Sequence, residues 1–115
     1  MELKYVGSGT RYSKAVIHGS TVYLAGNVAK DPGPTAAEQA RMILSQIDDT
    51  LALCGIDKSR IMTATIVFAD MRDFDAVNDV WDAWVLPDHL PTRTPIEAKL
   101  ITPRHLVAMQ ITAAL

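Results

Sequence analysis

The segment from Thr35 to Gly55 constrains the fold most, because it combines a helix start signal, an apolar stripe and a helix stop signal. Thr35 and Glu38 form a capping-box pattern, in which each residue satisfies a free backbone N–H of the other. Apolar residues then recur at helical spacing, at Ala40, Ile43, Leu44, Ile47 and Leu51. Gly55 is a typical helix end. One amphipathic helix cannot bury its own stripe, so the remaining residues must supply a sheet that covers it.

The rest of the chain contains strand patterns and one further helix pattern. Two short β-branched runs, 14–17 and 21–26, are separated by a turn with Gly19 and predict a hairpin. Asp70 is a typical helix cap, and Phe74, Val77, Trp81 and Trp84 then recur at helical spacing before Pro87. Three other segments have strand character: 60–68, 94–100 and 106–114.

This order predicts an α+β domain with both helices on one face of a mixed β-sheet. The chain has no repeat, low-complexity tract or linker, so residues 1–115 are expected to form a single domain. The second face of the sheet needs an explanation as well. The strands contain too few polar positions for both faces to be exposed to solvent, as Val16, Val22, Ile66, Val107 and their neighbours show. The second face is therefore predicted to be buried against other subunits.

Composition and charge exclude several classes of partner. A net charge of −2 and a pI of about 5.8 provide no electrostatic footprint for nucleic acid. No apolar run approaches the roughly 18 residues of a membrane span. Residues 1–5 lack the apolar core of a signal peptide, so a cytoplasmic location is expected.

The single cysteine, Cys54, cannot form an internal disulfide, and it is interpreted as a small apolar helix residue rather than a nucleophile.

Arg93 is the residue whose surroundings point most clearly to chemistry. Pro91 and Pro95 stiffen the backbone on either side of it, because each fixes its own φ and restricts the residue before it. A guanidinium held in this way is suited to a planar anion, since its donors match a carboxylate two-to-two. A surface arginine in a structural ion pair is the alternative, and the local residues leave both interpretations open.

The chain resembles the reactive-intermediate deaminase family (RidA/YjgF-type, also called L-PSP endoribonuclease-like). The resemblance covers nearly the whole length of the chain. Arg11-Tyr12-Ser13-Lys14 is similar to the tyrosine-bearing entry segment of the family, and Leu24-Ala25-Gly26-Asn27-Val28 to its strand-end turn. Phe74-Asp75-Ala76-Val77-Asn78, followed by Trp81 and Trp84, matches its second helix, and Pro91-Thr92-Arg93 matches the start of its C-terminal signature.

The resemblance implies a homotrimer of chorismate-mutase-like protomers with clefts between subunits. Members hydrolyse reactive enamines and imines, such as 2-aminoacrylate, to 2-keto acids and ammonia without a cofactor or metal. In this chain Arg93 would then bind the carboxylate of the small-molecule substrate. Tyr12 would enter the same cleft from the neighbouring subunit, with the backbone of Ala25 and Gly26 lining it. Asn78 matches a motif position, where it would either contact substrate or hold the helix by a hydrogen bond.

The chain departs from the family pattern at two positions. Pro95 replaces a cysteine whose carbonyl helps to hold the attacking water, and proline keeps that carbonyl. Ala108 replaces a glutamate that would orient the water and carry its proton, a role worth about 100- to 10,000-fold in rate. Glu97 is not placed in the cleft by its spacing, and Gln110 would orient water but is a poor base.

Two functions therefore remain open. The first is an imine or enamine hydrolase, and the second is a trimeric carboxylate-binding protein that has lost the base. Ribonuclease activity is the third and weakest hypothesis, because the chain lacks a paired acid and base in a basic groove. His105 beside Arg104 is interpreted as a turn residue, as is His18.

Overall fold

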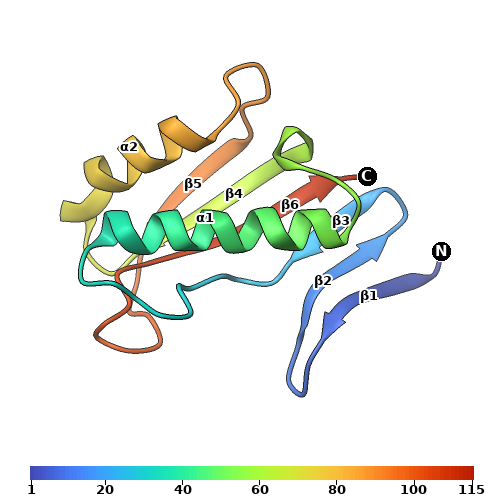
Figure 1. Cartoon of the computed structure of the whole chain (residues 1–115), viewed down its shortest axis with the longest axis horizontal. Coiled ribbons are helices and arrows are strands. Elements are labelled where there is room, and N and C mark those ends of the chain that lie inside the picture. Colours follow the sequence, from blue (N-terminus) through green and yellow to red (C-terminus); the bar gives the residue numbers. More distant parts are fainter.

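The computed structural model describes all 115 residues as one six-stranded sheet with two α-helices. The strands are β1 (Leu3–Ser8), β2 (Ser13–His18), β3 (Thr21–Leu24), β4 (Ile61–Phe68), β5 (Thr92–Glu97) and β6 (Val107–Ala114). The helices are α1 (Ala36–Leu53) and α2 (Phe74–Trp84), and short 3-10 turns, Lys58–Arg60 and Met71–Asp73, precede β4 and α2. The strand order is β1-β2-β3-β6-β4-β5, and β4 with β5 is the parallel pair. Both helices lie on the same face of the sheet (Figure 1).

Helix α1 begins and ends as its sequence predicts. The Thr35 hydroxyl accepts from the backbone N–H of Glu38, and the Glu38 carboxylate accepts from the backbone N–H of Thr35. At the other end Gly55 adopts φ +76°. The N–H groups of Gly55 and Ile56 donate to Ala52 and Leu51 respectively, which closes the last turn.

The core lies between the helices and one sheet face. In β6 the odd-numbered residues are buried and the even-numbered residues are half-buried. The apolar stripe of α1 is buried with them, and Val77 and Trp81 of α2 are buried as well. The predicted α+β architecture, with two helices on one face of a mixed sheet, is confirmed. No helix in this structure is both long enough and apolar enough to span a membrane.

The prediction about the second sheet face rested on a wrong assignment of residues to faces. Val22, Ile66 and Val107 are fully buried beneath the helices, so only Val16 of the four named residues lies on the open face. On the open face, the Thr63 and Thr112 side chains hydrogen-bond to each other. Other apolar side chains, Tyr5, Tyr23 and Ile96, are exposed on the open face, so its burial against other subunits stays a prediction that rests on different residues.

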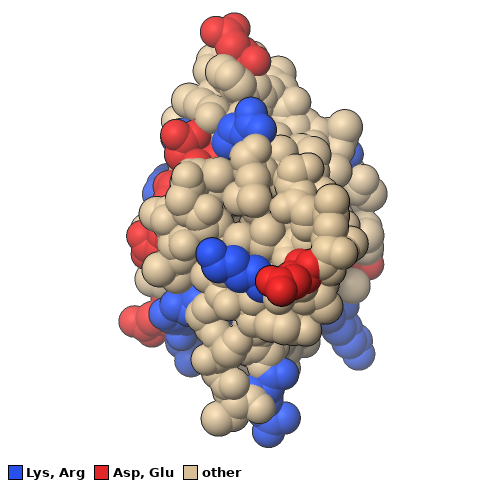
Figure 2. All heavy atoms as spheres, turned by 90° about the vertical axis from the view of Figure 1, so that its right-hand side faces the viewer, with Lys and Arg blue, Asp and Glu red and all other residues tan.

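Strand β1 was not predicted. It pairs antiparallel with β2 and forms one edge of the sheet, with Tyr5 opposite Val16. Its sequence, Leu-Lys-Tyr-Val-Gly-Ser, lacks a clear alternation, and Gly7 has φ +64°. At the end of the molecule near β1 and β2, acidic and basic side chains are interspersed among uncharged ones (Figure 2).

Gln39 ties α1 to the two loops that flank its first turns. The side chain is fully buried, and its Nε2 donates to the carbonyls of Gly33 and Arg104 at 2.8 Å each. Its Oε1 accepts from the N–H of Leu106 at 2.8 Å. These three hydrogen bonds satisfy backbone groups that are buried in the fold and cannot bond to water.

We predict that Gln39→Leu lowers the free energy of unfolding by about 3 kcal/mol, because the buried carbonyls of Gly33 and Arg104 and the N–H of Leu106 lose their hydrogen-bond partner. Urea denaturation monitored by circular dichroism measures this loss. Arg41→Leu, at an exposed position of the same helix, is the control and is expected to change stability by less than about 0.5 kcal/mol. Equal stability of the Gln39 variant and wild type would contradict the prediction.

Candidate functional site

Arg93 lies on the edge strand β5, with its side chain directed at α2. Its Cα pairs with that of Ala64, a buried core residue, so both side chains are on the helix-covered face. Nη2 of Arg93 donates to Oδ1 of Asn78 at 2.7 Å. The Cζ atom lies 5.3 Å from the Trp81 ring centroid and 5.9 Å from that of Phe74. Phe74, Asn78 and Trp81 share one face of α2, since their spacings are four and three residues.

The guanidinium of Arg93 is held entirely by neutral groups. The chain contains one ion pair, between Arg72 and Asp70, and no carboxylate lies within ion-pair distance of Arg93. The alternative of a structural ion pair is therefore wrong for Arg93 within the protomer. Aromatic rings and an amide fix the position of the cation without neutralising it.

Pro95 lies two residues further along the same edge. The N–H of Ala98 donates to the carbonyl of Phe68 at 3.0 Å, so the even-numbered residues of β5 direct their backbone groups at β4. By alternation, the carbonyl of Pro95 is directed away from the sheet, at its open edge. Proline is tolerated there because no ladder hydrogen bond is lost.

A second group of the predicted residues lines a cavity of about 410 Å³ at the other end of the sheet. Tyr12 is 68% exposed in the turn between β1 and β2, and it shares this cavity with Ala25 and Gly26, which follow β3. The N–H of Ala25 donates to the carbonyl of Lys14 at 2.9 Å, which fixes this segment against β2. A Cβ added at Gly26 would meet no atom within 4 Å, so the backbone here is open to a ligand.

The two groups do not meet within one protomer. Arg93, Asn78 and Pro95 lie at the β5 edge, whereas Tyr12, Ala25 and Gly26 lie beyond β3. Strands β4, β6 and β3 stand between β5 and β2, a separation of roughly 20 Å at the usual strand spacing.

Ala108 and Gln110 lie on the open face, beside the second group. Asn27 bridges to Met109, and Nε2 of Gln110 donates to the carbonyl of Leu24 at 3.0 Å. The same Nε2 donates to the carbonyl of Ile111 at 3.2 Å. A glutamate at position 108 would therefore stand two strands away from Pro95 of its own protomer, roughly 10 Å from it.

The other candidate residues have structural partners. Glu97 Oε1 accepts from the N–H of Met71 at 2.9 Å. Nδ1 of His105 and the Thr102 hydroxyl form a hydrogen bond of 2.8 Å, which confirms the prediction of a turn residue. Burial raises the pKa of the Cys54 thiol and the Lys4 ammonium offsets part of that rise, as suits an unreactive cysteine. No three His, Cys, Asp or Glu side chains are grouped to hold a metal ion.

Sequence reasoning missed the aromatic surface under Arg93. The sequence places Phe74 and Trp81 on the apolar stripe of the second helix and in its family motif, without a contact to Arg93. Their spacing from Asn78 was visible in the sequence, but only the pairing of β5 beside β4 places Arg93 next to them. Lys14 and Lys30, which line the second cavity, were missed as well.

Comparisons with known proteins agree with this fold. The family model described as endoribonuclease L-PSP matches residues 4–115. A RutC family protein of Haemophilus ducreyi is 42% identical over 105 residues, covering 91% of this chain and 90% of its own length. The crystal structure of a YjgF family member from Neisseria meningitidis is 43% identical, with a TM-score of 0.96, and the match covers 99% of this chain and 95% of that one.

The chain therefore belongs to the endoribonuclease L-PSP family, whose relatives carry the names YjgF and RutC, and the predicted family is confirmed. A more distant relative has an activity in its name. The 2-iminobutanoate/2-iminopropanoate deaminase of Capra hircus is 36% identical over 76 residues, covering 61% of this chain and 56% of its own length.

Proposed function

We propose that this protein hydrolyses reactive imines and enamines that carry a carboxylate, of the 2-aminoacrylate type, to 2-keto acids and ammonia. The position of Arg93 carries the proposal, because its guanidinium is fixed by Asn78, Trp81 and Phe74 yet has no carboxylate partner. A fixed cation with unused donors is a receptor for a planar anion. The deaminase named among the distant relatives supports the choice of reaction.

In the proposed reaction the enamine first tautomerises to the imine. A water oxygen then adds to the imine carbon, the nitrogen takes up a proton, and the resulting carbinolamine loses ammonia to leave the keto group. Arg93 binds the substrate carboxylate, and the outward carbonyl of Pro95 accepts a hydrogen bond from the attacking water. Fixing substrate and water together lowers the barrier of an intrinsically facile hydrolysis.

The complete site is proposed to form between subunits of a homotrimer. One subunit supplies Arg93, Pro95 and Asn78, and the next supplies Tyr12, Ala25 and Gly26. The separation of these groups within one protomer supports this arrangement, since only a second copy can bring them together. Contacts between two different surfaces of identical chains close into a ring when the rotation permits. Ala108 and Gln110 then face the cleft from the Tyr12 side.

A second candidate function is carboxylate binding without catalysis. Ala108 favours it, because the side chain in place of the glutamate of the family pattern cannot accept a proton from water. The small metabolite would be held by Arg93 in the same cleft and would leave unchanged.

Arg93→Lys is predicted to weaken binding of a 2-keto acid such as pyruvate about tenfold or more, because lysine lacks the planar fork of donors. Isothermal titration calorimetry measures the change, and the melting temperature is expected to stay nearly constant. Arg72→Lys, at a side chain that is 78% exposed, serves as the matched control. Unchanged pyruvate affinity in the Arg93 variant would remove the observation that carries both proposed functions.

The intersubunit site predicts complementation between two inactive variants. Arg93→Ala and Tyr12→Ala are each expected to abolish imine hydrolysis, since each removes one side of every cleft. After unfolding and co-refolding at equal ratio, about a quarter of the clefts combine two intact sides, so about a quarter of wild-type activity should return. Light scattering on the same samples should give about three times 12.6 kDa. A monomer, or no recovery on mixing, would contradict the composite site.

Ala108→Glu is predicted to accelerate imine hydrolysis, because it supplies a base beside the Tyr12 side of the cleft. Coupled assays with an amino-acid oxidase, following conversion of imine to keto acid, measure the effect. Ala108→Gln, of similar size but without a basic group, is the control and is expected to give no gain. If neither wild type nor Ala108→Glu accelerates any imine while both bind keto acids, the binding function is the correct one.

A further inference from the structure

The cavity beside Tyr12 carries an excess of basic side chains that the proposed reaction does not use. Lys14, Lys30 and His105 line it, and Asp49 is the one acidic residue among the lining residues. With His105 neutral, two lysines and one aspartate leave a local charge of +1, although the whole chain carries −2. Neither lysine has a carboxylate within ion-pair distance. The positive charge of this cavity is therefore available to a ligand.

Lys14 and Lys30 are both exposed, and local structure constrains the stem of the first and the backbone of the second. Gly7 leaves room for the stem of Lys14, because a Cβ there would lie 2.8 Å from Cδ of Lys14. Gly7 also has φ +64°, a conformation that disfavours other residues. The absence of a side chain at position 7 thus lets Lys14 lie across β1.

The backbone of Lys30 is held by Gln46 of α1. The backbone N–H of Lys30 donates to Oε1 of Gln46 at 3.0 Å, and Nε2 of Gln46 donates to the carbonyl of Val28 at 2.9 Å. The segment that carries Lys30 is thereby tied to the helix. His105 uses Nδ1 in its bond to Thr102, which leaves Nε2 for a ligand.

The size of the cavity is also informative. Its volume of about 410 Å³ lies within the range of small-molecule sites. A three-carbon imino acid bound to Arg93 would fill little of this space and would leave its basic side chains without a partner. A longer substrate with a second negative charge would fill the cavity and pair with them.

We propose that this cavity is a subsite for the distal carboxylate of a dicarboxylic substrate, so that the preferred substrates are the imines of four- and five-carbon 2-keto diacids. This inference rests on the proposed function. Arg93 of one subunit takes the carboxylate next to the imine carbon, and Lys14 and Lys30 of the next subunit take the distal one. A local charge of +1 matches a singly charged carboxylate, whereas a phosphate ester carries close to two negative charges.

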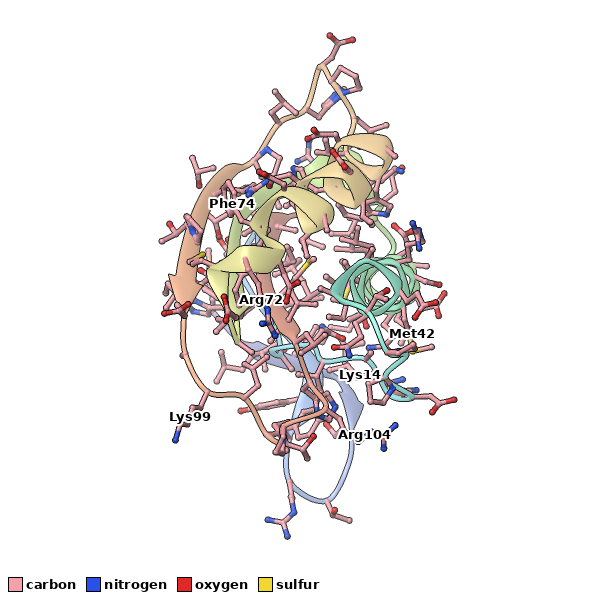
Figure 3. The ribbon with its side chains drawn as sticks, turned by 90° about the vertical axis from the view of Figure 1, so that its left-hand side faces the viewer. Lys14, Met42, Arg72, Phe74, Lys99 and Arg104 are labelled. Atoms are coloured by element: carbon pink, nitrogen blue, oxygen red, sulfur yellow. The ribbon has the colours of Figure 1, made fainter.

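The test compares two imines that amino-acid oxidases generate in situ in the assay, one from aspartate and one from alanine. Wild type is expected to show at least a tenfold higher kcat/KM for the imine from aspartate. Lys14→Met should remove most of that preference, by lowering kcat/KM for the imine from aspartate much more than for the imine from alanine. Lys99→Met is the matched control, because this exposed lysine lies in the loop after β5 and does not line the cavity (Figure 3). Lys30→Met is the second test variant, in case the first fails to fold.

Calorimetry with oxaloacetate and pyruvate separates this inference from the proposed function. Tighter binding of oxaloacetate that Lys14→Met abolishes supports the subsite even if no imine is hydrolysed. Hydrolysis of the alanine-derived imine with no preference for the aspartate-derived one would overturn the subsite and leave the proposed function intact. A preference for dicarboxylates that survives in both lysine variants would overturn it as well.

Discussion

The parallel pairing of β4 with β5 is the constraint on which the candidate site depends. Two parallel neighbours in a sheet cannot be joined by a tight turn, so the chain must cross over the sheet between them. Helix α2 lies within that crossover, on the covered face. Its inner surface thereby comes to rest over β5, where Phe74, Asn78 and Trp81 contact Arg93. The position of the guanidinium is thus a result of topology as much as of the local Pro91 and Pro95.

Neutral contacts give this arginine an unusual electrostatic situation. An aspartate in place of Asn78 would make a stronger bond but would also satisfy the positive charge. The amide fixes one Nη2 donor and leaves the charge for a ligand, while the rings of Trp81 and Phe74 restrict the rest of the group. Pre-positioning of this kind reduces the entropy that a ligand must overcome when it binds.

Local signals in the sequence were sufficient for the helices and for most strands. The Thr35–Glu38 capping box and Gly55 predicted α1 closely, because these interactions lie within a few residues of one another. Strand β1 escaped prediction because an exposed edge strand needs no apolar alternation. The error over Val22, Ile66 and Val107 has a different origin: alternation separates the two faces of a strand but does not say which one the helices cover. The division of the site residues into two distant groups could not be predicted from the residues themselves, since it depends on strand order across the whole sheet.

Pro95 also has a consequence for how the molecule avoids uncontrolled growth. Strand β5 is a free edge, and a free edge presents unpaired backbone groups that can recruit a strand from another chain. The outward-facing position that would offer an N–H in the middle of β5 is occupied by proline, which has none. A ladder of hydrogen bonds along this edge would therefore be interrupted at Pro95, between the outward N–H groups of Arg93 and Glu97. The same residue that leaves a carbonyl free for a water molecule thus also protects the sheet from open-ended, amyloid-like extension.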